Sequence, residues 1–527
     1  MTLRLREVPL HLGEDESGLA RRVAKLVGLA EGDIQDLKIV RMGIDARRKP
    51  DVLRVYEVEF SCRNEAKLLD QLARPNLTPV EPLPAPVSYT LTDRPRVLVV
   101  GMGPSGLFAA LKLAEGGAEV QLIERGQPVE DRLRKVRDFW AGGPLDPQSN
   151  TQFGEGGAGT FSDGKLNSRL NHPWMRQVLE TLARFGAPPE ILWQAKPHVG
   201  SDRLRKVLIH FRQQLLALGV NIRFSTRLDG LLLKDGRVCG GRLESGEELA
   251  CDHLVLAPGH SARDTYHMLQ QTGVALEPKA FAVGLRVEHP RELINLIQHG
   301  HKNHPQLPAA EYALAWNDKQ TGRGIYSFCM CPGGVVVNSS SEEGGIVVNG
   351  MSLHRRDSEL SNSALVVSVR PEDFGDDDPL AGVRFQRHWE QEAYRAGGDS
   401  WLAPAQPLLE FLHGRGGRLR SSCEPGVIHA DLKRCLPGFV SDGIVKALPF
   451  FNRRMPGFVG PEATLIGVET RTSAPLRILR DASGESVSHP GLYPLGEGAG
   501  YAGGIMSSAV DGLKTANLIL QANSPRK

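Results

Sequence analysis

The sequence predicts an α/β fold: a parallel sheet with helices, a smaller module before it, and further strand-like segments between the first and last parts of the sheet. Residues 96–124 read as strand, glycine turn, helix and strand, and residues 491–520 as strand, turn and helix. Between them, the segments IVVNGMS and ALVVSV have the length and β-branched content of strands. The three observations together favour an α/β fold built on a parallel sheet, with further strands between its first and last segments.

The unit RVLVVGMGPSGLFAALKLAEGGAEVQLIE has the pattern of a dinucleotide-binding βαβ unit. Its first strand is a continuous apolar run, as expected of a parallel strand buried on both faces. Three glycines then follow at GxGxxG spacing, which lets the backbone approach a pyrophosphate at the helix N-terminus. An acid roughly 20 residues further on is placed for ribose hydroxyls. The candidate binding residues here are Gly101, Gly103, Pro104, Ser105, Gly106, Glu124 and Arg125.

Composition bounds the class of protein. The 527 residues suffice for several domains, and a net charge of +2 gives no bulk attraction for nucleic acid or anionic lipid. Seven cysteines scattered over this length do not form a disulfide framework, which favours a reducing, cytoplasmic compartment. No segment reads as a secretory signal or reaches the roughly 20 apolar residues of a membrane span. The oligomeric state is left open.

The N-terminal region reads as a small βαββ module over residues 1–75, followed by a proline-rich linker over residues 76–92. The module carries a basic cluster, Arg47, Arg48 and Lys49. This cluster is most simply a solvated loop, and an RNA-docking role is the alternative.

Residues 221–262 predict a β-meander that leads into an apolar strand ending in Ala257-Pro258-Gly259. The glycine-rich block SNTQFGEGGAGTFSDGKLNSR at residues 149–169 has few apolar anchors, so we expect it to wrap a ligand, with Gly156, Gly157 and Thr160 nearest. The alternative is a mobile surface loop.

The C-terminal stretch GLYPLGEGAGYAGGIMSSAVDGLKTANLIL contains a strand, a turn and a helix that begins near Gly504. Glycines at the helix entry permit close approach, and a helix N-terminus stabilises negative charge on a ligand. The same segment could also be a core helix with a glycine-rich entry. Its candidate binding residues are Gly496, Glu497, Gly503, Gly504 and Ile505.

These blocks, with SFCMCPGG, VVNGMS and GVETRTSAPLRI, resemble a family of uncharacterised FAD-dependent dehydrogenases of the glutathione-reductase-type superfamily, over essentially the whole chain. The resemblance implies a Rossmann-like FAD-binding domain in two parts, residues 93–262 and 463–527, around an inserted mixed or antiparallel α+β substrate or cap domain at residues 263–462. It implies that APG, with Ala257 and Gly259, passes close to the nucleotide and that the backbone near Leu228 reads the adenine. Glu497 stands where the family's acidic residue contacts the ribityl chain.

Three groups are candidates for chemistry near a flavin. Cys329 and Cys331 lie two apart on a strand, so both thiols share a face and could form a redox pair; buried structural cysteines are the alternative. Arg471 offers a charged fork for a substrate carboxylate or phosphate, oriented by Glu469, or the two form a structural ion pair. Asn349 could hold substrate or the polar edge of the ring. No zinc-ligand spacing or other metal motif emerges.

The resulting prediction is an FAD-dependent oxidoreductase that transfers a hydride between the flavin and a small organic substrate, with an anionic group as one option. NAD(P)H as electron donor is left open, because no second nucleotide-binding unit is visible. The alternatives are an RNA-associated flavoprotein, against which the even charge count argues, and a non-catalytic, redox-sensing flavin-binding protein.

Overall fold

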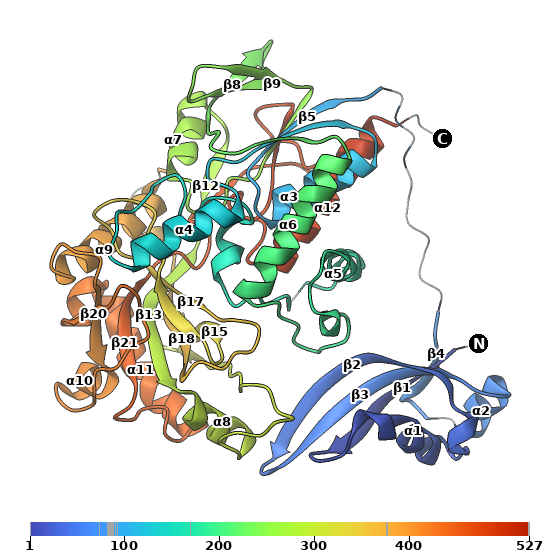
Figure 1. Ribbon diagram of the computed structural model, residues 1–527. Coiled ribbons are helices and arrows are strands. Elements are labelled where there is room, and N and C mark those ends of the chain that lie inside the picture. The colour runs from blue at the N-terminus through green and yellow to red at the C-terminus, as the bar shows by residue number, and fades with distance from the viewer. Residues whose placement is uncertain are drawn as a thin grey trace.

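The computed structural model describes residues 2–72, 74–81, 89, 91, 93–168, 170–375 and 378–524. Figure 1 shows a small N-terminal module beside a larger body that contains a parallel sheet and a second, mixed sheet. Among the helices of these residues, none has both the length and the apolar character needed to cross a bilayer.

The N-terminal module is a four-stranded antiparallel sheet in the order β2-β3-β1-β4. Alternate residues of β3 are buried, as expected of a strand with one face on a core. The helix α1 covers that face with Leu19, Val23 and Val27. The elements are β1 (Leu3–His11), α1 (Leu19–Val27), β2 (Gln35–Arg48), β3 (Asp51–Ser61), α2 (Glu65–Leu72) and β4 (Leu77–Pro79).

The module is longer than the sequence predicts. Leu77–Pro79 lies in the segment predicted as linker, but it forms β4 and pairs antiparallel with β1. The predicted βαββ unit thus gains α2 and a fourth strand, because the backbone of β1 offers an unpaired edge that a short strand can complete. The rest of the predicted linker includes residues 82–88, 90 and 92, which lie outside the described residues.

The module docks on the body through backbone hydrogen bonds. The Met42 amide in β2 donates to the Trp193 carbonyl at 2.7 Å, and the Ala195 amide donates to the Met42 carbonyl at 2.8 Å. At the tip of the β2–β3 hairpin, Lys49 Nζ donates to the Ile297 carbonyl at 2.5 Å. The basic cluster is therefore partly used in this internal contact, and Arg47 pairs with Asp45.

A five-stranded parallel sheet in the order β23-β11-β5-β6-β7 forms the centre of the body, which confirms the predicted parallel sheet. The strand β5 is central and lies between β11 and β6. Its apolar side chains are buried on both faces of the sheet, Val97 and Val99 in one core and Leu98 in another. The strands are β5 (Arg96–Val100), β6 (Glu119–Ile123), β7 (Asn221–Arg223), β11 (His253–Leu256) and β23 (Leu492–Pro494).

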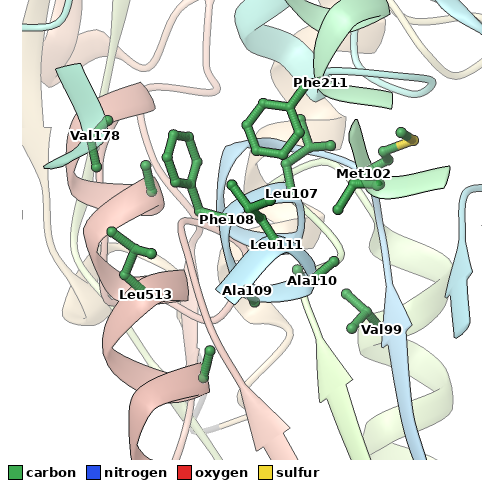
Figure 2. Packing of buried hydrophobic residues seen from close by; sticks show 14 of the residues in the cluster. Val99, Met102, Leu107, Phe108, Ala109, Ala110, Leu111, Val178, Phe211 and Leu513 are labelled. Atoms are coloured by element: carbon green, nitrogen blue, oxygen red, sulfur yellow. The ribbon is translucent and has the colours of Figure 1, made fainter. Parts of the chain in front are cut away.

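Five helices contribute to the main core on one face of this sheet. Figure 2 shows Phe108 and Leu111 of α3 packed among Phe211 of α6, Val178 of α5 and Leu513 of α12. The helices α3 and α12 run closely side by side, because Gly512 faces the Ser105 backbone, where a Cβ would lie 2.2 Å from the Ser105 carbonyl oxygen. The helices are α3 (Pro104–Glu115), α4 (Val129–Trp140), α5 (Trp174–Arg184), α6 (Ser201–Ala217) and α12 (Ile505–Ala522).

The opposite face of the parallel sheet is covered by the predicted meander and by α7. Leu98 and Leu254 of the sheet pack with Leu228 and Val238 of the meander and with Tyr266 of α7. The elements are β8 (Leu228–Lys234), β9 (Arg237–Leu243), β10 (Glu248–Ala250), α7 (Arg263–Thr272) and the paired strands β12 (Leu276–Pro278) and β22 (Leu476–Ile478).

The second sheet of the body has seven strands in the order β14-β15-β18-β13-β21-β19-β20 and is antiparallel except for the pair β19/β20. A core that includes α11 covers one of its faces. The strands are β13 (Phe281–Pro290), β14 (Ala315–Asp318), β15 (Arg323–Cys331), β18 (Leu360–Val369), β19 (Ala403–Pro407), β20 (Val427–His429) and β21 (Thr464–Glu469). Around them lie β16 (Val335–Asn338), β17 (Val348–Met351), α8 (Arg291–His299), α9 (Ala381–Ala396), α10 (Leu408–His413) and α11 (Gly438–Arg454).

One strand and one helix lie in a different part of the fold than the sequence predicts. The strand β21 lies in the predicted second FAD segment, but it pairs with β13 and β19 of the seven-stranded sheet. The helix α7 lies in the predicted inserted domain, but Tyr266 and Leu269 pack on the parallel sheet. Every residue of β21 is buried, as expected of a strand that lies between two neighbours in a sheet. The helix α7 packs against the face of β11 that the helices of the main core leave free.

Candidate functional site

A cleft of about 1500 Å³ separates the parallel sheet from the uncovered face of the seven-stranded sheet. It lies at the carboxyl ends of β5, β6 and β11, where ligands bind in open α/β sheets. Segments that are far apart in the sequence line it. They are residues 100–105, 123–125, 152–153, 157–159, 162–165, 226–228, 257–262, 311–315, 325–330, 471–472 and 500–508, with several single residues between.

The glycine turn after β5 is shaped by close backbone contacts. Gly101 has φ +98°, and a Cβ there would lie 2.2 Å from the Ala257 carbonyl oxygen. A Cβ at Gly106 would lie 1.9 Å from the Gly101 carbonyl oxygen, so Gly106 serves the turn and does not itself line the cleft. The helix α3 then begins at Pro104 with no side-chain cap, which leaves its first-turn amides available to a ligand in the cleft.

Glu124 holds the turn against the glycine-rich block. Its Oε2 accepts from the Met102 amide at 2.8 Å, and its Oε1 accepts from the amides of Gly126 and Gly154 at 2.9 Å each. The carboxylate lines the cleft, but its oxygens already bind three backbone amides. Its structural role is therefore to fix two segments relative to each other, and contact with a ribose is an additional role that the sequence predicts.

Replacing Glu124 with glutamine is expected to weaken cofactor binding. The glutamine NH₂ would face a backbone amide that now donates to a carboxylate oxygen, leaving a buried donor unsatisfied at a cost of about 1–3 kcal/mol. We expect FAD affinity to fall about tenfold, measured by fluorescence titration of the apoprotein. The control is Glu119→Gln in β6, the strand that ends just before Glu124, at an exposed position that does not line the cleft. Unchanged affinity in the Glu124 variant would contradict this role.

The glycine-rich block folds over the turn after β5. Gly157 lines the cleft, and a Cβ there would lie 3.1 Å from the Gly103 Cα. Gly156 and Thr160, which the sequence places nearest to a ligand, do not line it. Thr160 is fully buried, where its Oγ1 donates to the Glu155 carbonyl at 3.0 Å and accepts from Arg132 at 3.1 Å. The two residues face away from the cleft because the buried Arg132 guanidinium lies on that side of the loop and donates to its carbonyls and to Thr160.

At one end of the cleft, the predicted nucleotide residues Leu228, Ala257 and Gly259 all line the wall. Arg125 also lines it and makes two hydrogen bonds to Asp264, at 2.9 and 2.7 Å. The Arg125 guanidinium stacks over the Phe153 ring at 4.2 Å from its centroid. These contacts give this end a rigid wall with a flat guanidinium and an apolar strand end, which suits an aromatic base.

The C-terminal motif lies across the cleft from β15. Gly503 and Gly504 line it with no heavy atom within 4 Å of the position of a Cβ, and α12 begins at Ile505 without a side-chain cap. Gly496 does not line the cleft, because a Cβ there would lie 2.4 Å from Ser105 Oγ. Glu497 does line it, and burial raises the pKa of its carboxyl to about 7 against the opposing effect of Lys279.

These features fit FAD. The cleft has the volume for a dinucleotide. The uncapped N-termini of two helices that lie far apart in the sequence, α3 and α12, open into it. A side chain at Gly503 or Gly504 would occupy open space in the cleft. The first helix suits a pyrophosphate and the second suits a ring edge that carries negative charge.

Arg471 is not the free cationic fork that the sequence predicts. Its Nε and Nη2 donate to the Glu390 carboxylate at 2.9 and 2.7 Å, and its Nη1 donates to Ser341 Oγ at 2.6 Å. Glu469 pairs instead with Arg286, so the predicted ion pair between Glu469 and Arg471 is wrong. Because Glu390 lies on α9, far away in the sequence, nothing near Arg471 in the chain indicates this partner.

Cys329 and Asn349 meet at the Arg286 guanidinium. Arg286 is fully buried on the cleft side of β13, where Nη1 donates to the Cys329 carbonyl at 2.9 Å and Nη2 donates to Asn349 Oδ1 at 2.7 Å. Cys329 and Asn349 line the cleft, whereas Cys331 lies fully buried behind them. Burial raises the pKa of Glu469 to about 7, even with Arg286 beside it.

Several residues of the site carry no signal in the sequence. His260 follows the APG strand end and lines the cleft, and burial, with Arg471 and Arg263 nearby, lowers its pKa to about 3, so it is neutral at neutral pH. Lys165 and Lys196 line the other end of the cleft. Lys165 lies within the glycine-rich block that the sequence predicts to wrap a ligand, and this placement is the sequence feature that could have indicated it.

Comparison with known proteins agrees with this geometry. Residues 96–157 match an FAD binding domain, residues 280–472 match the model "FAD-dependent protein, C-terminal domain-like", and residues 3–61 match a domain of unknown function. The second match covers the seven-stranded sheet with β21, in agreement with the strand pairing.

Two related proteins match this chain over very different lengths. An uncharacterized protein of Clostridium beijerinckii is 43% identical over 99% of both chains. A menaquinone reductase of Mycolicibacterium smegmatis is 27% identical over 33% of this chain and 39% of its own length.

Two solved structures are similar at low TM-scores. Glycine oxidase from Bacillus cereus has a TM-score of 0.36 at 12% identity, covering 82% of this chain and 98% of its own. Glycerol-3-phosphate dehydrogenase from Bacillus halodurans, complexed with FAD, has a TM-score of 0.37 at 11% identity, covering 83% and 67%. From the sequence relative and the matched domains, the chain belongs to the family of the Clostridium beijerinckii protein and is an FAD-dependent protein.

Proposed function

We propose that this protein transfers a hydride between FAD and a small organic substrate that carries an anionic group. The observation that carries the proposal is the continuity of the cleft. One cavity joins the uncapped N-termini of α3 and α12 to a polar region under β14 and β15 that holds Lys165 and Lys196. A substrate in that region shares the cavity with the flavin end of the cofactor.

The proposed cofactor residues divide into two groups. Gly103, Gly157 and the first turn of α3 hold the pyrophosphate, whereas Glu497, Gly503 and Gly504 lie at the flavin end. Bound FAD supplies two-electron hydride chemistry at its ring system. The two chain segments that carry these groups meet where β23 pairs with β11, and we propose that they form one discontinuous FAD-binding domain of the glutathione-reductase type.

The substrate end has a surplus of positive charge. Lys165 Nζ and Lys196 Nζ lie 3.6 and 3.4 Å from the two oxygens of Glu311, and Arg356 Nη1 donates to the same carboxylate at 3.1 Å. Arg356 also pairs with Asp163. Three cations therefore face two carboxylates, so an anion that enters here meets one uncompensated positive charge. Asn317 and Tyr326 add polar groups to the same wall.

Binding of a model anion tests the substrate class. Benzoate, added to the FAD-loaded protein, is expected to perturb the flavin absorbance at lower concentration than benzamide does. Lys196→Met is expected to weaken benzoate binding about fivefold, corresponding to roughly 1 kcal/mol for a partly exposed charge. Lys234→Met, at an exposed site outside the cleft, is the matched control. Equal binding of benzoate and benzamide, or no effect of Lys196→Met, would remove the anionic group from the proposal.

The hydride donor is tested by anaerobic mixing with NADH and with NADPH. Loss of flavin absorbance with either identifies the nicotinamide as donor, and deuteration at the transferred position should then slow the loss. Persistence of the absorbance with both would eliminate NAD(P)H and leave the organic substrate as the hydride partner.

A further inference from the structure

The side chains of Cys329 and Cys331 face the cleft side of their sheet because β15 contains a bulge. The register against β18 shifts between Phe328 and Cys331, so that the bulged strand has one extra residue. Before the bulge, Tyr326 and Phe328 pack on the cleft side of the sheet, and Ile325 packs in the core beneath α11. Regular alternation would place the side chains of residues 329 and 331 on the same face as Ile325, away from the cleft. The bulge reverses the alternation, and Met330 enters that core instead.

The backbone at Cys329 is strained to achieve this. Cys329 has φ +43°, in the left-handed region that residues with a side chain seldom adopt. Such strain persists only where surrounding contacts hold it, and here Arg286 Nη1 donates to the Cys329 carbonyl at 2.9 Å. Bulges and strained residues of this kind occur next to active sites, where they redirect a side chain.

Space for the second thiol is made by Gly350 in β17. A Cβ at Gly350 would lie 2.7 Å from Cys331 Sγ and 2.5 Å from Arg286 Nη1. The Cys331 thiol donates to the Cys329 carbonyl at 3.4 Å. Both thiols are reduced in the structure. The two sulfur atoms thus share one small chamber, of which only the Cys329 side opens to the cleft.

The charges around this chamber distinguish the two thiols. The hydrogen bond from Cys331 and the Arg286 and Lys165 cations lower the pKa of Cys329 far below that of an ordinary thiol, while burial and Asp163 oppose the shift. The pKa of Cys331 is raised by the same hydrogen bond and by burial. Glu469 and Glu497 also face Cys329, and burial raises the pKa of both carboxyls to about 7. Of the two thiols, Cys329 is therefore the one that ionises more readily.

We propose that Cys329 and Cys331 form a dithiol–disulfide couple that exchanges an electron pair with FAD bound in the cleft. The inference rests on the proposed function, because it requires FAD beside Cys329. In the oxidative direction an S–S bond forms between the two sulfur atoms, and the S–H bond of Cys331 breaks. The two electrons and the Cys331 proton pass to FAD, which is reduced as the cysteines are oxidised. The reverse transfer restores the thiolate and the thiol.

The couple would give the protein a second two-electron store in addition to the flavin. A bridge between residues two apart in a strand is strained, and strained disulfides are reduced readily. Reduced FAD is therefore a competent donor to the oxidised pair. Because Cys331 is fully buried and Cys329 lines the cleft, Cys329 is the sulfur that any external thiol or disulfide would meet.

Anaerobic reductive titration of the FAD-loaded protein with dithionite tests the proposal. The visible spectrum before titration shows whether FAD is bound, which tests the proposed function separately. The wild type, oxidised beforehand with ferricyanide, is expected to take up about four electrons per FAD, because the flavin and the couple each accept two. Cys329→Ser and Cys331→Ser are expected to take up about two. Cys239→Ser, which removes a thiol outside the cleft, should match the wild type.

Thiol counting on the wild type provides a measurement that does not depend on the folding of a variant. Alkylation in denaturant after ferricyanide treatment should leave two of the seven cysteines unmodified, and peptide mass spectrometry should find them bridged as Cys329–Cys331. Uptake of about two electrons per FAD by the FAD-loaded wild type, or modification of all its thiols after oxidation, would overturn the couple while leaving the FAD site intact. A protein that binds no FAD would overturn both.

Discussion

Replacing Glu390 with glutamine is expected to lower the free energy of unfolding by about 3–5 kcal/mol. Glu390 is 2% exposed and accepts hydrogen bonds from two buried guanidinium groups, Arg263 at 2.8 and 3.0 Å and Arg471 at 2.7 and 2.9 Å. Thr470 donates to the same carboxylate at 2.7 Å. Removing the charge leaves the buried Arg263 and Arg471 cations to share Glu342, and an uncompensated buried charge is costly.

Urea unfolding of the Glu390→Gln variant measures this effect. Glu392→Gln is the matched control, because it lies on the same helix and pairs with Arg395 at an exposed site, where the expected change is within about 1 kcal/mol. The strands and helices that meet here come from both sheets, so we also expect weaker FAD retention in the Glu390 variant. A change below about 1 kcal/mol would show that the cluster does not hold the two sheets together.

The same carboxylate gives the wild type a pH dependence. Burial alone would raise the pKa of Glu390, but Arg263 and Arg471 outweigh burial and hold that pKa well below its ordinary value. A carboxyl whose pKa is lower in the folded state contributes stability above its unfolded pKa and loses it as the pH falls. The wild type should therefore lose stability below the ordinary carboxyl pKa, and Glu390→Gln should lose less over the same range.

Replacing Gly106 with valine is expected to abolish FAD binding and destabilise the protein. A Cβ at this position would lie 1.9 Å from the Gly101 carbonyl oxygen and 3.6 Å from the Ala257 Cβ. The obstruction is backbone, so the strand β5 and the helix α3 must separate. We expect a loss of stability at or above the roughly 1–3 kcal/mol that is usual for overpacking. The glycine turn and the first turn of α3 would move together, and with them the proposed pyrophosphate site.

FAD content after reconstitution and the thermal midpoint measure the outcome. Gly438→Ala is the control, because Gly438 lies at the first position of α11 with no heavy atom within 4 Å of a Cβ. Gly106→Ala should show an intermediate loss, since the contact begins at the Cβ itself. A Gly106→Val protein that binds FAD like the wild type would contradict the packing argument.

The sequence predicted those parts of the site that depend on local backbone pattern. Glycine spacing, apolar runs and helix starts located Gly101, Gly103 and the entry of α12, because each acts through its own backbone and immediate neighbours. The parallel sheet followed from the same patterns. The matches to an FAD binding domain and to the C-terminal domain of an FAD-dependent protein confirm FAD dependence.

Long-range side-chain pairing could not be predicted. Arg471 bonds to Glu390, and Glu469 bonds to Arg286, with separations along the chain of 81 and 183 residues. The direction of Thr160 depended on Arg132, which lies in another helix. The strand β21 could not be assigned to its sheet because a short apolar strand next to a domain boundary fits either neighbour. The reversal of alternation at Cys329 required a bulge that has no sequence signature here.

The account depends most directly on FAD occupying the cleft between the two sheets. The decisive measurement is the FAD-to-protein ratio of wild type and Gly106→Val after incubation with excess FAD and gel filtration. The account predicts about one FAD per wild-type chain and almost none for the variant. Wild-type protein that elutes without FAD, or equal FAD retention by the two proteins, would contradict it.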